Sequence, residues 1–414
     1  MTDTPAPNGR RSRRDVAGAV SAQFSQALGS FLLQVLAARL LGDEGFAVFA
    51  VLFGLVVLGT AVVSGFVGDS LTVLDRTVAA VRRGLQWWLV AISVVLGITA
   101  VVGLGGSQYL SWRDSLLFAL AGVAFVVEDT LRRMLMASMR FWSIVLVDLA
   151  SLVGSVGVIA VAGVVGDVTL AHFLGGLLVG QLLATVVGVA LLPRADRWWA
   201  RGVRPERAVV FEYGKWRAMQ VSVRPAMLAV MRVGVVAGVG RAAYGQLVAA
   251  RLFVAPAMLA VNGASSYLFA SFARTKEHAT RALLAQADRG VLALAVVSLA
   301  AGVVAAALAP SLGVAVVGDE FDLDRWSVFG WSVYAAATAA ATPYGVLAAV
   351  RGRQSVTLVA RLGDAALALV AVAVAVGVGW ATSTIPYALG VFALAGGLVI
   401  RQTMVSDIAR GRVP

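Results

Sequence analysis

The chain is a succession of apolar runs, most of them about twenty residues long, separated by short polar segments. A helix of about 20 residues crosses the hydrocarbon core of a bilayer. Sixty per cent of the residues are hydrophobic and 14% are charged, whereas about 25% are charged in soluble domains. The runs and the composition together exclude a soluble enzyme and a disordered chain, and they predict a polytopic membrane protein.

Twelve runs have the length and apolarity of spanning helices, which predicts an all-α integral membrane protein. They are residues 16–38, 46–68, 85–104, 115–139, 143–165, 170–192, 216–239, 244–272, 290–312, 326–350, 355–380 and 385–400. The first run is too long for a signal-peptide core and lacks a small-residue cleavage site, so we expect it to be an uncleaved span.

The distribution of basic residues predicts the orientation. The chain has 34 Lys and Arg against 22 Asp and Glu, a net charge of +12. Most of the basic residues fall in alternate connecting segments, as expected for cytoplasmic loops that follow the positive-inside rule. We therefore expect both termini to be cytoplasmic, and we assign the charge to topology rather than to nucleic-acid binding.

The longest predicted loop lies at the midpoint of the chain and divides the spans into two six-helix lobes. The expected organisation is a cytoplasmic tail (1–15), an N-terminal lobe (16–192), a basic linker (193–214), a C-terminal lobe (215–405) and a second cytoplasmic tail (406–414). Leu41-Gly42 and Val239-Gly240 each precede an aromatic residue, Phe46 and Tyr244, at an offset of 198 positions. This echo indicates parallel repeats.

Polar residues recur at helical spacing inside the predicted spans. Gln23, Gln26, Ser30 and Gln34 share one face of the first span, and Tyr334 belongs to a similar face of span 326–350. Such faces either line a hydrated cavity or hold helices together by hydrogen bonds. The sequence leaves both interpretations open.

Two arginines, Arg224 and Arg251, fall within predicted spans, where charge is costly and often functional. Their guanidinium groups favour binding of phosphate or pyrophosphate. The alternative is a structural ion pair with Asp148 or Glu128.

Carboxylates within the spans are candidates for ion or proton coupling, and Asp148 is the first of them. Glu128 and Asp129 lie four residues before Arg132 and Arg133, a spacing that favours a solvated helix end. The rival interpretation is a gate or a proton-coupling site. Asp364 and Arg361 are predicted to form a local ion pair.

Several residue types and motifs that catalytic or metal sites require are absent from the sequence, which excludes some classes of function. It has no cysteine and two histidines, which excludes a thiolate or multi-histidine metal site, and we expect no cofactor. It also has no phosphate-binding glycine loop with a lysine, so we expect no ATPase activity of its own.

Three segments resemble a known family. The segment Ala38-Arg-Leu-Leu-Gly-Asp-Glu-Gly-Phe-Ala-Val-Phe-Ala50 resembles the turn after the first span of polysaccharide and lipid-linked oligosaccharide flippases of the multidrug/oligosaccharidyl-lipid/polysaccharide (MOP) exporter superfamily. The segment from Arg232 to Ala250, with Gly240 and Tyr244, is similar to spans 7 and 8 of that family. Leu347-Ala-Ala-Val-Arg-Gly-Arg353 resembles the turn between spans 10 and 11.

The resemblance implies two six-helix lobes in a V that opens alternately to each side of the cytoplasmic membrane of a bacterium. It implies a lipid-linked sugar as cargo, whose sugar-pyrophosphate head passes through a basic cavity. Arg224, Arg251 and Arg39 would bind that head, while Gln23, Gln26, Gln34 and Tyr334 would contact sugar. Expected partners are membrane lipids and, in the cell, polysaccharide polymerases or glycosyltransferases, with no nucleic acid.

Three other functions compete with that of a flippase. A multidrug exporter of the same fold would favour acidic residues in its cavity, whereas this chain places arginines in its spans. A polysaccharide polymerase or ligase needs a large outside loop for catalytic residues, and the predicted outside loops are short, so we expect no enzyme. A membrane scaffold without transport activity is compatible with the sequence.

Overall fold

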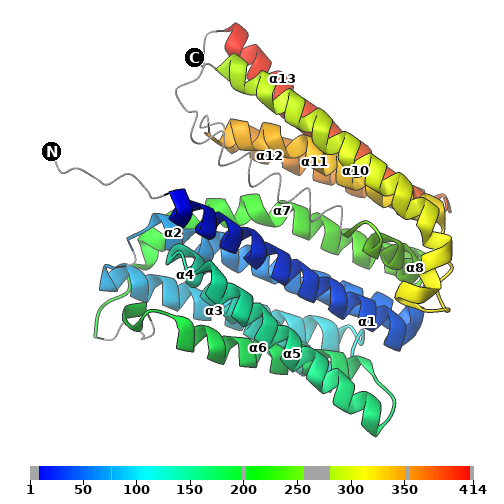
Figure 1. Cartoon of the computed structure of the whole chain (residues 1–414), viewed down its shortest axis with the longest axis horizontal. Coiled ribbons are helices and arrows are strands. Elements are labelled where there is room, and N and C mark those ends of the chain that lie inside the picture. Colours follow the sequence, from blue (N-terminus) through cyan, green and yellow to red (C-terminus); the bar gives the residue numbers. More distant parts are fainter. Residues whose placement is uncertain (1–8, 76, 197–201, 256–279, 351–353, 411–414) are drawn as a thin grey trace. The chain divides into compact units, whose positions relative to one another are not determined.

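The computed structural model describes residues 9–75, 77–196, 202–255, 280–350 and 354–410, and the described secondary structure is helical. The helices are α1 (Gly9–Val63), a π-helical turn (Ser64–Gly68), α2 (Ser70–Val73), α3 (Ala79–Gly106), α4 (Trp112–Ala137), α5 (Phe141–Val165), α6 (Leu170–Leu191), a 3-10 turn (Arg194–Asp196), α7 (Arg207–Val239), α8 (Arg241–Leu252), α10 (Thr280–Val317), α11 (Arg325–Val350), α12 (Gln354–Gly377) and α13 (Thr384–Ala409). Figure 1 follows them along the chain.

Eight described helices are long and apolar enough to cross a membrane. One of them, Ala17–Gly68, has 52 residues and contains the predicted first and second spans. The helices α4 and α11 have 26 residues each and correspond to predicted spans. Most of span 244–272 lies outside the described residues, so the total of twelve stays a prediction.

The predicted spans fall on helices where the structure describes the chain, but some helices are longer: α10 (Thr280–Val317) extends beyond span 290–312, and α13 (Thr384–Ala409) extends beyond span 385–400 into the predicted tail. By contrast, span 143–165 corresponds to α5 (Phe141–Val165) and span 170–192 to α6 (Leu170–Leu191). The predicted linker 193–214 differs, because α7 begins at Arg207. Residues 207–215 are Arg-Ala-Val-Val-Phe-Glu-Tyr-Gly-Lys, in which charged residues and a glycine interrupt the apolar ones, so the predicted span began only at Trp216.

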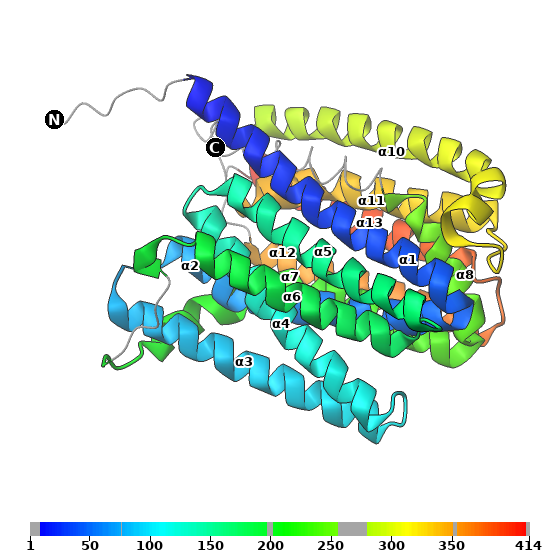
Figure 2. The same ribbon diagram turned by 60° about the horizontal axis from the view of Figure 1, so that its bottom comes forward.

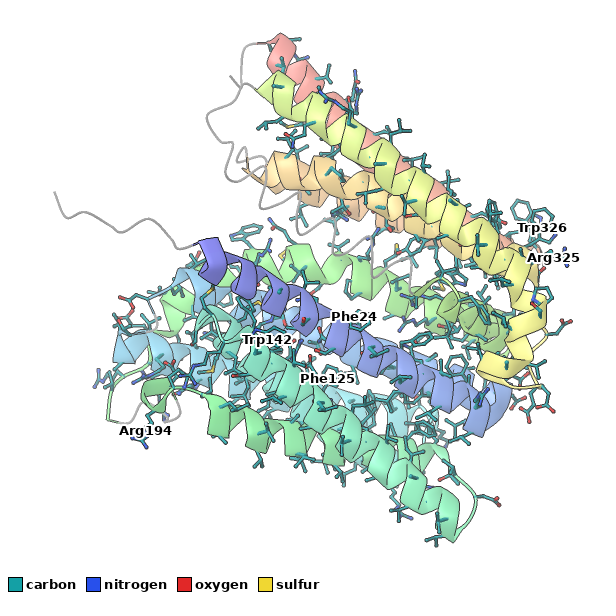
Figure 3. All side chains as sticks on the ribbon, in the orientation of Figure 1. Phe24, Phe125, Trp142, Arg194, Arg325 and Trp326 are labelled. Atoms are coloured by element: carbon teal, nitrogen blue, oxygen red, sulfur yellow. The ribbon has the colours of Figure 1, made fainter. Side chains whose placement is uncertain are left out.

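The surface of α3 shows why these helices belong in lipid. Val90, Val94, Ile98 and Val102 recur every four residues along one face, and each is about half exposed. A soluble protein rarely exposes such a continuous apolar stripe. Aromatic side chains such as Trp142 and Trp326 also project from the helices (Figure 3), as amphipathic rings do at a membrane–water interface.

The chain divides into two compact units. Unit 1 comprises Met1–Leu33 and Leu52–Ser222, and unit 2 comprises Gln34–Val51 and Val223–Pro414. In unit 1, α5 packs on α6, α6 on α4 and α4 on α3; in unit 2, α10 and α13 pack on α11, and α12 packs on α13 (Figure 2). These bounds differ from the predicted lobes in one respect, because the segment Gln34–Val51 from the N-terminal half belongs to unit 2.

The helix α1 is broken within the segment Gln34–Val51 that belongs to unit 2. Gly42 has φ 64° and ψ −176°, a conformation open almost only to glycine. Gly240, between α7 and α8, has φ 92° and ψ 168°. The aromatic residues four positions later, Phe46 and Tyr244, are both buried. The similarity between the two halves therefore includes the backbone conformation of the glycine as well as the sequence of the turn.

Candidate functional site

An arginine-rich cavity lies inside unit 2. Arg224 on α7 and Arg361 on α12 line it together with Tyr334 on α11 and the carboxylate of Asp364. The Arg224 guanidinium carbon is 5.6 Å from the centre of the Tyr334 ring. The volume is about 20 Å³, which is enough for about one water molecule.

Arg251 extends this arrangement along α11. Its guanidinium carbon is 5.3 Å from the centre of the Trp331 ring, and that ring packs edge to face on Tyr334 at 5.8 Å. Cations stacked on aromatic faces are favourable when both are shielded from water. Arg251, Trp331, Tyr334 and Arg224 therefore form a continuous line of cation–aromatic contacts, which we call the arginine–aromatic line.

The aromatic members of this line are fixed in place. Trp331 donates a hydrogen bond from its indole nitrogen to the carbonyl oxygen of Leu247 at 2.8 Å. Tyr334 is buried, and its hydroxyl has no hydrogen-bond partner among the described residues. A buried hydroxyl without a partner is costly, so Tyr334 retains an unused donor and acceptor beside two guanidinium groups.

Positive charge is in excess around the arginine–aromatic line. Arg232 and Arg224 are close enough to Arg251 to repel it, and Arg224 likewise acts on Arg361. Asp364 is the carboxylate that lines the cavity with them. Arg232 lies within α7 and donates to the carbonyl oxygen of Ala50 at 3.2 Å. An interior with this charge balance favours an anion.

Arg39, another predicted head-group binder, lies elsewhere in unit 2. It is exposed and donates from Nε to the carbonyl oxygen of Val316 at 3.0 Å, near the break in α1. It does not line the cavity that holds Arg224 and Tyr334. Gln34 is half-buried in the same part of α1, whereas Gln23 is exposed in unit 1.

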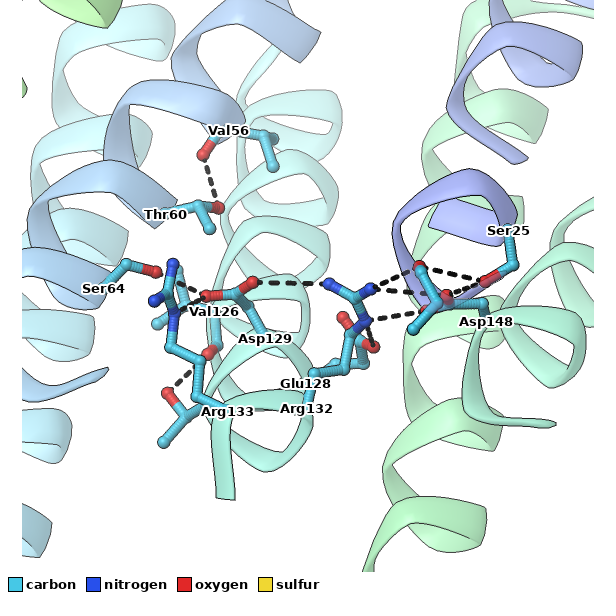
Figure 4. Close-up of polar contacts among 12 residues, drawn as sticks. Ser25, Val56, Thr60, Ser64, Val126, Glu128, Asp129, Arg132, Arg133 and Asp148 are labelled. Atoms are coloured by element: carbon cyan, nitrogen blue, oxygen red, sulfur yellow. Dashed lines mark hydrogen bonds and ion pairs between the residues drawn. The ribbon is translucent and has the colours of Figure 1, made fainter. Parts of the chain in front are cut away.

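A second polar cluster is buried in unit 1, where α4 meets α1 and α5 (Figure 4). Arg132 Nε is 2.7 Å from Asp148 Oδ1 and 3.6 Å from Glu128 Oε1. Ser25 donates a hydrogen bond to Asp148 from α1. Asp148 therefore pairs with Arg132 of its own unit, which gives it a partner other than the two arginines considered from the sequence.

The cluster continues along α4 toward the π-helical turn. Asp129 accepts hydrogen bonds from Arg133 at 3.0 Å and from Ser64 at 2.5 Å. Arg133 also donates a hydrogen bond to Asp69 Oδ1 at 3.2 Å. Arg217 of α7 donates to the other oxygen of the same carboxylate, Asp69 Oδ2, at 2.5 Å. π-helical turns occur frequently at functional sites.

The expectation of a solvated helix end for Glu128 and Asp129 is wrong. Glu128 and Arg132 are each 3% exposed, and Asp129 is 6% exposed. The spacing of four residues does bring these carboxylates and arginines together, but α1, α5 and α6 cover the face that carries Glu128. Sequence reasoning also missed Arg361, whose position beside Arg224 depends on how α12 packs.

Two cavities adjoin this carboxylate–arginine cluster. The larger, of about 330 Å³, is lined by Asp69, Asp129 and Arg133. The smaller, of about 40 Å³, is lined by Glu128 and Asp148. Gln26 and Ser30 line both. The predicted polar face of the first span therefore lines these cavities at two positions, Gln26 and Ser30.

The fold of the chain is that of MOP-superfamily transporters. The lipid II flippase MurJ in an inward closed conformation matches with a TM-score of 0.73 at 12% identity, over 94% of this chain and 87% of that chain. A multidrug resistance MATE transporter in an inward-facing conformation matches at 0.66 and 12%, over 93% and 95%. A MOP transporter from Pyrococcus furiosus matches at 0.66 and 10%, over 95% and 96%.

These likenesses concern the fold. No protein-family model matches the chain, and no curated protein is similar to it in sequence. The all-helical membrane architecture expected from the MOP resemblance is thus confirmed at the level of fold. The likeness to these structures does not extend to a substrate.

Proposed function

We propose that the chain moves a lipid-linked oligosaccharide or polysaccharide precursor across the membrane by alternating access. The observation that supports this most is the excess of guanidinium groups around the arginine–aromatic line of unit 2. Pyrophosphate is an anion that arginine binds through paired hydrogen bonds. Aromatic rings beside those arginines suit the apolar faces of sugars.

The small volume of the unit 2 cavity sets a requirement on the mechanism. A cavity of about 20 Å³ is too small for a pyrophosphate group. Arg224 and Arg361 must therefore separate in another state of the transport cycle, with Asp364 as their counter-ion when cargo is absent. Head-group phosphates would replace that carboxylate when cargo binds.

A binding experiment tests this role of the arginines. We expect Arg224→Ala and Arg361→Ala to weaken binding of a polyprenyl-pyrophosphate sugar by about 10- to 100-fold, since a hydrogen bond to a charged group contributes about 1.5–3 kcal/mol. Arg325→Ala is the matched control, because this arginine is exposed at the start of α11. Unchanged binding in both cavity variants would contradict the proposal.

Depletion of the protein in its own cells tests the transport step. Mass spectrometry of the polyprenyl-linked sugars should then show one complete lipid-linked unit accumulating on the cytoplasmic side. The same measurement names the sugar. A constant pool of these lipids would speak against a flippase.

Export of cationic drugs is the second candidate, and the carboxylate–arginine cluster of unit 1 favours it. Asp69, Glu128, Asp129 and Asp148 give this cluster more carboxylates than guanidinium groups. If this is the function, depletion should sensitise cells to cationic dyes, and Arg224→Ala should leave dye export unchanged. If depletion changes neither the pool of lipid-linked sugars nor the sensitivity of the cells to cationic dyes, a scaffold without transport activity becomes the better explanation of the protein's role.

A further inference from the structure

Four aromatic side chains cluster where α3 and α7 of unit 1 begin. Trp88 of α3 stacks on Phe211 of α7 with 5.5 Å between the ring centres, and both rings lie close to Phe66 of the π-helical turn, at 4.9 and 6.0 Å. Trp87 meets Trp88 edge to face at 4.8 Å and is exposed. Aromatic rings gather at the membrane–water interface because they are apolar with a polar edge. This group, which we call the interfacial aromatic cluster, therefore marks the level of the lipid head groups.

The start of α7 is fixed to the start of α3 by backbone contacts. The N–H of Glu206 donates to the carbonyl oxygen of Ala80 at 3.1 Å, and the indole nitrogen of Trp88 donates to the carbonyl oxygen of Arg207 at 3.0 Å. A Cβ at Gly84 would lie 2.6 Å from the Glu206 carbonyl oxygen, so the two segments are in close contact. The backbone at the start of α7 therefore has a fixed position relative to α3.

Cationic side chains border the interfacial aromatic cluster. The Arg207 guanidinium carbon is 4.9 Å from the centre of the Trp87 ring. Lys215 Nζ is 5.2 Å from the centre of the Phe211 ring and 5.8 Å from that of Trp216. A guanidinium group stacked on a ring keeps its N–H groups at its edge, where they can donate to an anion. Arg207 is exposed, so these N–H groups are accessible to a ligand.

Positive charge is in excess where these segments meet. In residues 69–88 and 204–217, the described acidic side chains are Asp69, Asp75, Glu206 and Glu212, and the described basic ones are Arg82, Arg83, Arg204, Arg207, Lys215 and Arg217. Six cations against four carboxylates leave two positive charges over. Two of the cations are compensated, since Lys215 pairs with Glu212 at 2.8 Å and Arg217 with Asp69 at 2.5 Å.

Arg83 and Arg207 are the uncompensated cations nearest to Trp87. Neither forms an ion pair within the part of the chain that the structure describes. Arg83 precedes Trp87 by four residues and so lies on the same face of α3, whereas Arg207 stacks on the Trp87 ring from α7. Two guanidinium groups from different helices therefore adjoin one exposed indole ring.

The same face of α3 continues into the hydrocarbon of the membrane. After Arg83 and Trp87 it carries Val90 and Val94, both of which are exposed. In order along the helix, this face presents a cation, an aromatic ring and aliphatic side chains. A phospholipid presents its phosphate, its ester groups and its acyl chains in the same order. The face is therefore complementary to a lipid molecule and not only to an anion.

We propose that Arg83, Trp87 and Arg207 bind an anionic phospholipid. The two guanidinium groups contact its phosphate, the Trp87 ring lies at the level of its ester groups, and one acyl chain follows Val90 and Val94. The predicted orientation places this end of α3 at the cytoplasmic leaflet, whose anionic surface attracts basic residues. The lipid bridges α3 and α7 and so stabilises the start of α7. This site does not depend on the proposed function.

Native mass spectrometry of the full-length chain in detergent tests the lipid site without any cargo. The protein is mixed with phosphatidylglycerol or with phosphatidylcholine of the same acyl chains, and the retained lipid of each kind is counted. We expect the wild type to retain phosphatidylglycerol preferentially. Arg83→Gln and Arg207→Gln should each weaken this preference about fivefold, and the double variant about 25-fold.

Arg325→Gln is the matched control. Arg325 is also exposed and lies beside an exposed tryptophan, Trp326, but the neighbouring Asp324 balances its charge. This variant should retain the preference of the wild type. Thermal unfolding in each lipid gives a second readout, because a ligand that binds the native state stabilises it. Phosphatidylglycerol should raise the Tm of the wild type and of Arg325→Gln, but not that of the double variant.

Three results would overturn the proposal. A wild type that retains both lipids equally has no site for an anionic lipid, and this result needs no variant. An unchanged preference in the double variant would show that other residues bind the lipid. If inorganic phosphate raises the Tm of the wild type as much as phosphatidylglycerol does, the site takes a free anion instead of a lipid. If the double variant does not fold, the two single variants decide the same question, since each is expected to lose about fivefold.

Discussion

At the scale of single residues, Asp148 joins three helices of unit 1 through one carboxylate. It lies on α5, pairs with Arg132 of α4 and accepts a hydrogen bond from Ser25 of α1. Asp148 is 9% exposed and Arg132 is 3% exposed, so little solvent screens the pair. Removing one partner of such a pair leaves the other charged and buried, which costs more than the pair itself contributes.

We therefore expect Asp148→Ala to lower the free energy of unfolding by about 1–3 kcal/mol, the cost of losing a buried charged partner, because Arg132 keeps Glu128 at 3.6 Å and Asp129 at 3.8 Å. Denaturant or thermal unfolding of the detergent-solubilised protein measures this. Arg132→Met should be the more costly change, because it leaves both Glu128 and Asp148 buried without their arginine partner. An Arg132→Met variant as stable as Asp148→Ala would contradict this order.

Asp75 provides the control for this comparison. Hydrogen bonds from the hydroxyl and the backbone N–H of Thr77 hold the pKa of the Asp75 carboxyl below its usual value. Stability from these bonds is present above the unfolded pKa and is lost only as the pH falls through the lower folded value. Asp75 is fully exposed, so Asp75→Ala should leave stability at neutral pH nearly unchanged.

At the scale of elements, two glycine turns place aromatic residues inside unit 2. Gly42 breaks α1 and Gly240 separates α7 from α8, each with positive φ and an extended ψ. The second turn packs on the first, because a side chain added at Gly245 would meet the backbone of Asp43. Gln246 reinforces the contact by donating to Asp43 Oδ2 at 3.5 Å, and it also donates to the carbonyl oxygen of Glu320 at 3.0 Å.

Substitution at the break in α1 should be costly. Gly42→Ala places a side chain in a glycine-only conformation, and its Cβ would also crowd the carboxylate of Glu320. We expect a loss of about 1–3 kcal/mol in the free energy of unfolding. Gly29→Ala in the same helix has open space around its Cβ and should be neutral or slightly stabilising. Equal thermal stabilities of the two variants would contradict this role of Gly42.

The packing of α5 on α6 also depends on glycine. A Cβ at Gly180 would lie 2.5 Å from the carbonyl oxygen of Ser151, and a Cβ at Gly154 would lie 2.8 Å from Gly180 Cα. Small residues at such contacts let helix backbones approach closely in membranes. We expect Gly180→Ala to destabilise the protein by about 1–3 kcal/mol through overpacking. Gly157→Ala, with open space around it on α5, is the control in the same thermal assay.

At the scale of the whole molecule, the orientation in the membrane is a prediction from charge. The apolar exposed faces and the lengths of the helices establish that the chain suits a bilayer, but the same helices would fit it in either direction. Only the basic residues of the connecting segments break this symmetry, through the positive-inside rule. Both termini are expected in the cytoplasm on this basis.

The absence of cysteine makes the orientation simple to measure. Thr77, before α3, and Gln108, after it, are both exposed. We expect a membrane-impermeant thiol reagent added outside the cell to label Gln108→Cys, whereas Thr77→Cys should react only after the membrane is opened. The reverse pattern would invert the topology, and labelling of both from outside would show that α3 does not span.

By itself, the sequence determined the class of protein, the positions of most helices and the turn that recurs in both halves. Apolar length and periodicity are local properties of the chain, and lipid imposes them on each span separately. For this reason α5 and α6 match their predicted spans within two residues at each end. The turns at Gly42 and Gly240 could be predicted in the same way, from the residues next to each glycine in the sequence.

Only the tertiary structure decided which charges meet. Glu128 and Asp129 were expected at a solvated helix end, whereas the packing of α1, α5 and α6 covers them. Arg361 and Asp364 line one cavity, and the packing of α12 also brings them to Arg224 and Tyr334 of two other helices. The assignment of segment Gln34–Val51 to unit 2 is likewise a property of the tertiary packing, since it depends on which helices this segment contacts. A polar residue in a membrane is satisfied by partners far away in sequence, because desolvation depends on every helix around it and not on its own helix alone.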